Sequence, residues 1–206
     1  MKSVDIYVSN DGTGRELALD EVEKYAHERD FSRKARLHAR LLAEEMLGLV
    51  SEITGKFYAY FRVDENDDAY MLCLSAQSEM DAEKHDMLLD VSTTGKNAAV
   101  RGIRDKIKNA FEYFWRGYKQ SVNSYGMNEY ESLMSYGMTS YVPVSGASIW
   151  SLSQYRTNVK KDSDGKNYSE EWDELEKSII ANLADDVSVG INGDKVEIII
   201  TKKFEQ

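Results

Sequence analysis

An apolar stripe at helical spacing, followed at once by two strand-like runs, is the feature that most constrains how this chain can fold. Within residues 33–54 apolar side chains recur at the 3.6-residue period, which predicts an amphipathic helix with one buried side. Ser32 is placed to cap this helix, and Gly55 suits the position just after its last turn. The stripe consists of Leu42, Met46, Leu49, Val50 and Ile53.

Two pairs of strand-like runs predict two antiparallel hairpins. Residues 56–63 and 69–75 are rich in aromatic and apolar side chains and flank the acidic turn 64–68. Near the end of the sequence, residues 187–191 and 196–200 alternate apolar and polar side chains on either side of Asn192-Gly193, which predicts a type I′ turn. The chain therefore contains a sheet of hairpins as well as helices.

The other predicted elements complete an α+β fold. Residues 4–8 predict a short strand, residues 9–14 a glycine-containing turn, and residues 17–29 a helix whose apolar side chains include Leu17 and Val22. Helices are also predicted over residues 81–89, 98–115 and 169–183, the last capped by Ser169. We expect a two-layer sandwich of helices on a mixed, largely antiparallel sheet.

One segment, residues 117–167, differs in composition from the rest of the chain. It is rich in Ser, Tyr, Gly and Met, contains the only proline, Pro143, and loses helical periodicity. Long irregular segments in compact domains commonly serve as lids or binding surfaces. We interpret the segment as an insertion in a single domain spanning residues 1–206, and residues 117–145 as a candidate surface for a protein partner. The alternative is a partly ordered loop with a hairpin around residues 149–157.

Composition excludes several classes of function. The formal net charge is −10, from 26 Lys and Arg against 36 Asp and Glu, and the cations are interspersed with acids along the sequence, so nucleic acid is not an expected partner. The single cysteine, Cys73, lies in an apolar run, which excludes an intramolecular disulfide and fits a reducing compartment. No run approaches the roughly 18 apolar residues of a membrane span. We expect a soluble, cytoplasmic protein.

The adjacent acids Glu44 and Glu45 are the first candidates for chemistry. At about 100° per residue, Glu45 falls on the border of the apolar stripe, whereas Glu44 points to the opposite, solvated side. A carboxylate at such a border could orient water, or hold Mg²⁺ through water, as a general base does. Glu45 is therefore the candidate catalytic residue. The alternative is an ordinary acid at the rim of the helix.

A polar turn before the predicted helix 98–115 is the second candidate. Ser, Thr and Gly at such a position expose free backbone N–H groups, and a lysine adds positive charge, so the turn could bind a phosphate or a carboxylate. The alternative is that its hydroxyls cap the helix without any ligand. The predicted nucleotide-binding residues are Ser92, Thr93, Thr94, Gly95, Lys96 and Asn97.

No metal site is predicted. Acids and a glycine within residues 160–171 occupy four positions of an EF-hand loop, but Lys160 stands where the first carboxylate ligand belongs, so a turn leading into a helix is favoured. The three histidines, His27, His38 and His85, lack the spacing of metal ligands.

The order of predicted elements resembles the GHKL ATP-binding fold of histidine kinases, gyrase and the anti-sigma factor serine kinases. Residues 41–55 are similar to the family's N-box helix, and residues 169–204 are similar to its closing helix and hairpin. The resemblance implies ATP and Mg²⁺ as cofactors, Glu45 as catalytic base or water-mediated metal ligand, and the segment 117–167 as a lid.

The chain departs from the family at each signature. The N-box asparagine should follow Glu45 by four residues, where the sequence has Leu49. The place of the adenine-binding Asp-x-Gly-x-Gly, residues 74–80, has neither Asp nor Gly. Residues 11–14, Asp-Gly-Thr-Gly, resemble that motif but lie before the helix that carries Glu45 instead of after it, so we interpret them as a turn. We therefore predict a degenerate GHKL-like domain with a ligand- or partner-binding regulatory role and no retained catalysis. The alternative is an active ATPase or serine kinase of anti-sigma factor type.

Overall fold

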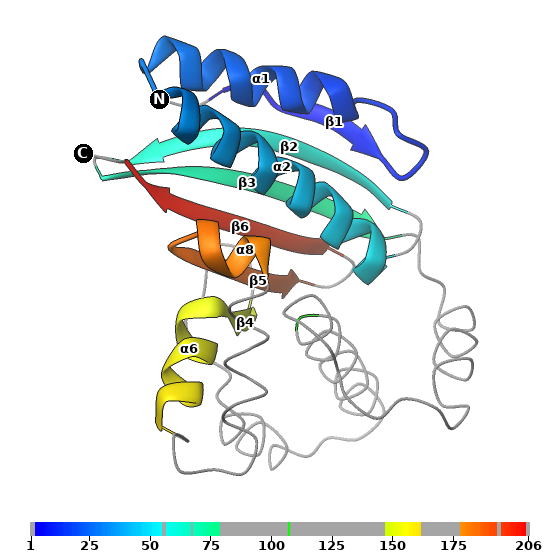
Figure 1. Ribbon diagram of the computed structural model, residues 1–206. Helices are drawn as coiled ribbons and strands as arrows, with labels where there is room; N and C mark the ends of the chain where they lie inside the picture. The colour runs from blue at the N-terminus through cyan, green and yellow to red at the C-terminus, as the bar shows by residue number, and fades with distance from the viewer. Residues whose placement is uncertain are drawn as a thin grey trace.

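The protein has an α+β fold in which six strands form one sheet in the order β1-β2-β3-β6-β5-β4 (Figure 1). The computed structural model describes residues 3–54, 57–66, 68–78, 107, 147–161, 178–192 and 195–204. The elements are β1 (Ile6–Ser9), α1 (Arg15–Glu28), α2 (Arg33–Thr54), β2 (Phe57–Asn66), β3 (Ala69–Ser78), β4 (Ala147–Ser151), α6 (Leu152–Lys161), α8 (Ile179–Leu183), β5 (Asp186–Asn192) and β6 (Lys195–Lys203).

Every pairing between the described strands is antiparallel, so the predicted mixed sheet is wrong in that detail. Both predicted hairpins, β2–β3 and β5–β6, are confirmed. The first is longer than predicted, because Asp64 and Glu65 belong to β2. In the second, Asn192 pairs with Lys195 and ends β5, whereas the prediction placed Asn192 in the turn.

The helices α1, α2 and α8 lie over one face of the sheet (Figure 1). The strands turn alternate side chains toward this helical layer: in β2, Phe57, Ala59, Phe61 and Val63 are buried, whereas Tyr60 between them is 52% exposed. This period-two alternation places the hydrophobic core between the sheet and the helices.

The long helix α2 is confirmed as predicted from its apolar stripe. The Oγ of Ser32 accepts a hydrogen bond from the N–H of Ala35 at 3.1 Å, as an N-cap residue does. Leu42, Met46 and Leu49 are fully buried in the core. Burial of each such side chain stabilises the fold by about 1.5–3 kcal/mol, so packing rather than helix propensity fixes the position of α2.

The turn between α1 and α2 is a Schellman motif with an aspartate in the left-handed position. Asp30 has φ 53°, its N–H donates to the carbonyl of His27, and the N–H of Phe31 donates to the carbonyl of Ala26. The ring of Phe31 packs edge-on against Tyr25, with centroids 6.1 Å apart. On α1 the buried side begins at Ala18 and Leu19, and Leu17 is 64% exposed, so it does not belong to the apolar stripe.

Two predictions in the second half of the chain are wrong. Residues 152–157 do not form a hairpin with residues 149–151, because β4 ends at Ser151 and α6 begins directly after it. The predicted helix 169–183 is not continuous, since Ser178 is extended and its side chain caps α8 by accepting from the N–H of Ala181. The predicted helices 81–89 and 98–115 lie outside the described residues except for Ile107, which is helical and buried.

Among the described residues, no helix combines the length and the apolar character that crossing a membrane requires.

Candidate functional site

Glu45, the predicted catalytic residue, is half-buried on α2. It lies between the solvent and the buried stripe, as its position in the helix predicts, and it does not line any of the three cavities outlined below. One turn further along α2, Leu49 is fully buried in the core. A hydrocarbon side chain therefore occupies the place where the GHKL resemblance calls for a metal-ligating amide. The catalytic role of Glu45 stays a prediction.

Other predicted site residues lie outside the described part of the chain. These are the nucleotide-binding residues Ser92, Thr93, Thr94, Gly95, Lys96 and Asn97, the partner surface 117–145 and all but the first two residues of the loop 160–171. Of that loop, Lys160 and Lys161 end α6.

In the turn before α1, the carboxylate of Asp11 accepts hydrogen bonds from other residues of the same turn. The Oγ of Ser9 donates to Oδ1 of Asp11 at 2.5 Å, and the N–H of Thr13 donates to the same atom at 2.9 Å. These hydrogen bonds lower the pKa of Asp11 to about 2, with the Ser9 contribution the largest. The adjoining cavity measures about 70 Å³, well below the roughly 300 Å³ of small ligand pockets. The turn is structural, as predicted from its glycines.

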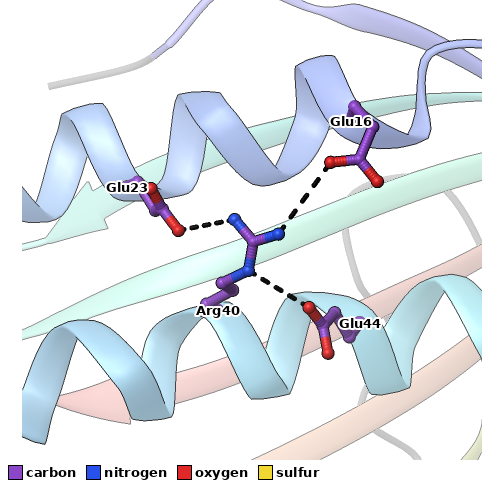
Figure 2. Close-up of polar contacts among 4 residues, drawn as sticks. All are labelled: Glu16, Glu23, Arg40 and Glu44. Atoms are coloured by element: carbon purple, nitrogen blue, oxygen red, sulfur yellow. Dashed lines mark hydrogen bonds and ion pairs between the residues drawn. The ribbon is translucent and has the colours of Figure 1, made fainter.

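Arg40 on α2 contacts three carboxylates, two of which belong to α1 and so connect the two helices (Figure 2). Its Nε lies 3.2 Å from Oε1 of Glu44 on α2, and one terminal nitrogen donates to Oε1 of Glu23 on α1. The other terminal nitrogen lies 3.9 Å from Oε2 of Glu16, also on α1. The hydrogen bond to Glu23 is the main cause that raises the pKa of Arg40. Glu44 is therefore an ion-pair partner of Arg40 and not the freely solvated acid that its helical position predicts.

A cleft of about 780 Å³ opens next to this ion-pair network, between α1 and the first half of α2. We call it the cationic cleft, because four of its seven lining side chains are Lys or Arg. Arg33, Lys34 and Arg36 have no ion-pair partner among the described residues. The lining residues are Glu23, His27, Arg33, Lys34, Arg36, Leu37 and Arg40.

The cationic cleft corrects the expectation that cations and acids are evenly interspersed. No acid occurs between Phe31 and Ala43, although the chain as a whole has a net charge of −10. This short run without acids predicts a local positive charge, which the net charge of the whole chain does not reveal.

A second cavity, of about 560 Å³, lies where the turn after α1 meets the ends of β3 and β6. Its apolar wall is an aromatic cluster in which the ring of Phe31 lies 5.3 Å from Tyr70 and 5.7 Å from Phe204, measured between centroids. Arg29 on its rim pairs with Glu65, and Lys202 lies 3.7 Å from Asp185. Of the three cations that line this cavity, only Lys203 has no ion-pair partner among the described residues. The cavity therefore has less capacity than the cationic cleft to attract an anion.

Comparison of the chain with protein-family models, with curated proteins and with solved structures gave no match.

Taken together, α2 carries two distinct chemical surfaces. Its second half presents two half-buried carboxylates, Glu44, which pairs with Arg40, and Glu45, which lies one turn before the buried Leu49. Its first half presents a row of cations around an open cleft. α2 therefore carries a group of cations at one end and two half-buried acids further along.

Proposed function

We propose that this chain is a regulatory binding domain of GHKL type that recognises a ligand or a protein partner and does not catalyse a reaction. The single observation that carries the proposal is the burial of Leu49. Mg²⁺ in nucleotide sites is held by oxygen ligands such as carboxylates, amide oxygens and phosphates. Leu49 has no such atom, and it is fully buried in the core, out of reach of solvent.

The elements around Leu49 support the GHKL part of the proposal. A long helix with a half-buried Glu leads into the β2–β3 hairpin, and the closing β5–β6 hairpin lies beside β3 in the sheet. This order of elements is the one on which the resemblance rests. The buried Cys73 suits a reducing compartment such as the cytoplasm. The Tyr- and Met-rich residues 117–145 remain the proposed surface for a protein partner.

The second candidate function is an active ATPase or serine kinase that uses ATP and Mg²⁺. The half-buried position of Glu45 favours it, because partial burial next to a core is where a general base is commonly placed. In this alternative Ser92 to Asn97 would contact the phosphates.

Nucleotide binding and hydrolysis distinguish the two candidates. The melting temperature would be measured with ATP and ADP, each with and without Mg²⁺, alongside phosphate release. A ligand at about 100 times its Kd adds about 2.7 kcal/mol of stability, which is a rise of roughly 5–10 °C for a chain of this size. We expect no Mg²⁺-dependent rise and no phosphate release.

Glu45→Gln is the matched variant for this experiment, because it keeps the shape of the side chain and removes its basicity. An Mg²⁺-dependent rise, with hydrolysis that Glu45→Gln abolishes, would establish the second candidate instead. A nucleotide-induced rise without Mg²⁺ dependence or hydrolysis would agree with a binding role.

A further inference from the structure

The cationic cleft is a concentration of positive charge on a chain of negative net charge. Arg33, Lys34 and Arg36 have no ion-pair partner among the described residues, whereas Arg40 below them is held by Glu23 and Glu44. Three uncompensated cations around one cleft attract an anion. We propose that the cationic cleft docks an acidic peptide segment of a partner protein. This proposal goes beyond the proposed function and does not depend on the GHKL resemblance.

The spacing of the cations favours an extended ligand. The unpaired Arg33 and Arg36 lie one turn apart on one face of α2, about 4.5 Å along the helix axis at 1.5 Å per residue. Arg40, which is paired with Glu23 and Glu44, extends this row to about 10 Å. A compact anion such as phosphate is bound by donors that converge on one point, whereas a row of this length matches successive carboxylates of a peptide.

An apolar side chain within the row favours a peptide over a polyphosphate chain. Leu37 lies between Arg36 and Arg40 in the sequence, lines the cleft, and is 57% exposed. It offers a contact to an apolar residue between the acids of a ligand.

Arg33, Lys34 and Arg36 lie in the first turn of α2, where the helix dipole is positive and disfavours cations. The first turn of α2 contains no acid, whereas α1 carries Glu16 in its first turn and His27 in its last, as the helix dipole favours. Arg33, Lys34 and Arg36 therefore repel both one another and the positive end of α2. A bound carboxylate would relieve both repulsions.

The test uses the full chain and a fluorescein-labelled peptide, Glu-Glu-Leu-Glu-Glu-Leu-Glu-Glu, in an anisotropy titration. We expect saturable binding that weakens with salt. Removing the three unpaired cations together, as Arg33→Ala, Lys34→Ala and Arg36→Ala, should weaken binding by about tenfold or more, as expected when interfacial charges are lost. The matched control removes three exposed cations elsewhere, as Lys160→Ala, Lys195→Ala and Lys203→Ala. It should change the affinity by less than about twofold.

Further probes separate the acidic peptide from other occupants. Leu37→Ala should weaken binding of the Leu-containing peptide and leave binding of an all-Glu peptide unchanged. The proposal is overturned if the peptide does not bind saturably, if both triple variants lose affinity equally, or if a single-stranded oligonucleotide of equal charge or inorganic phosphate binds more tightly. Circular dichroism of each variant confirms that the fold is retained.

Discussion

Gly14 lies so close to Tyr7 that no side chain fits between them: a Cβ on Gly14 would lie 1.8 Å from the carbonyl oxygen of Tyr7. The obstacle is backbone, so it cannot rotate away. Gly14 also has φ 74° and stands at the N-cap of α1. Glycine is therefore required here by both conformation and close approach. This contact fixes the position of the first turn of α1 relative to β1.

Gly14→Ala should lower the free energy of unfolding by about 2–6 kcal/mol, because a left-handed backbone and an overlap with fixed atoms each cost roughly 1–3 kcal/mol. Gly12→Ala is the matched control, since Gly12 has φ 92° but no atom within 4 Å of the place that a Cβ would occupy. It should cost only about 1–2 kcal/mol, for the left-handed backbone alone. Urea denaturation measures both, and equal losses would contradict the steric explanation.

Asp30→Gly should stabilise the protein by about 0.5–1 kcal/mol, because Asp30 has φ 53° and carries a negative charge at the C-terminal end of α1. For a chain of this size the melting temperature should rise by roughly 1–4 °C. Asp30→Asn removes only the charge and should give a smaller rise. A lower melting temperature for Asp30→Gly would show that the aspartate has a role other than closing the turn.

Asp11 should titrate with a pKa of about 2 in the folded protein, below the ordinary value of 3.8 for an aspartate. Because the folded-state pKa is the lower one, the contribution of Asp11 to stability is complete above about pH 4 and is lost as the pH falls toward 2. The ¹³C shift of its carboxyl carbon, followed by NMR, measures the pKa directly. Ser9→Ala should move the midpoint toward 3.8, and an unchanged midpoint would exclude Ser9 as the main cause.

Arg40 and Glu23 should show a small coupling energy in a double-mutant cycle of Arg40→Met and Glu23→Gln. Glu23 is 51% exposed, so solvent screens the pair and we expect about 0.5 kcal/mol at low salt, decreasing as salt is added. The pair Arg40–Glu16 is the control, because Glu16 lies 3.9 Å away and is 78% exposed. Its coupling should be close to zero. Equal coupling in both cycles would mean that Arg40 does not distinguish between the two acids.

Elements with a strong local period could be predicted from the sequence. The stripe through Leu42, Met46 and Leu49 determines α2, and the alternation in residues 187–191 and 196–200 determines the β5–β6 hairpin. Each pattern lies within one element, so short-range information is sufficient.

The helix α6 was not predicted because its start depends on a distant residue. The N–H of Ser153 in its first turn donates to Oδ1 of Asp186 in β5, at 2.9 Å. Arg156 in the same helix donates to the carbonyl of Asp185, also at 2.9 Å. Of the α6 side chains whose burial the structure describes, only Leu152 and Val159 are fully buried, which leaves a weak apolar period. The residues that position α6, Asp185 and Asp186, are therefore distant from it in the sequence.

The cationic cleft shows the same limit for a candidate site. The cations of residues 29–40 are similar in the sequence, but folding pairs Arg29 with Glu65 and Arg40 with Glu23 and Glu44. Arg33, Lys34 and Arg36 stay unpaired among the described residues. Which cations are free to bind a ligand depends on tertiary contacts, which the order of residues does not reveal.

The position of β6 in the sheet determines when the fold can be completed. β6 is the last of the described elements in the chain, yet it lies between β3 and β5, with Leu72 opposite Ile200. During synthesis β1, β2 and β3 are therefore made well before β6. Until β6 is made, the backbone groups on the side of β3 away from β2 lack this partner strand. Such distant pairings slow folding, and an open edge invites pairing with another chain. A truncation that removes β6 would leave two separate pieces of sheet rather than a shorter one.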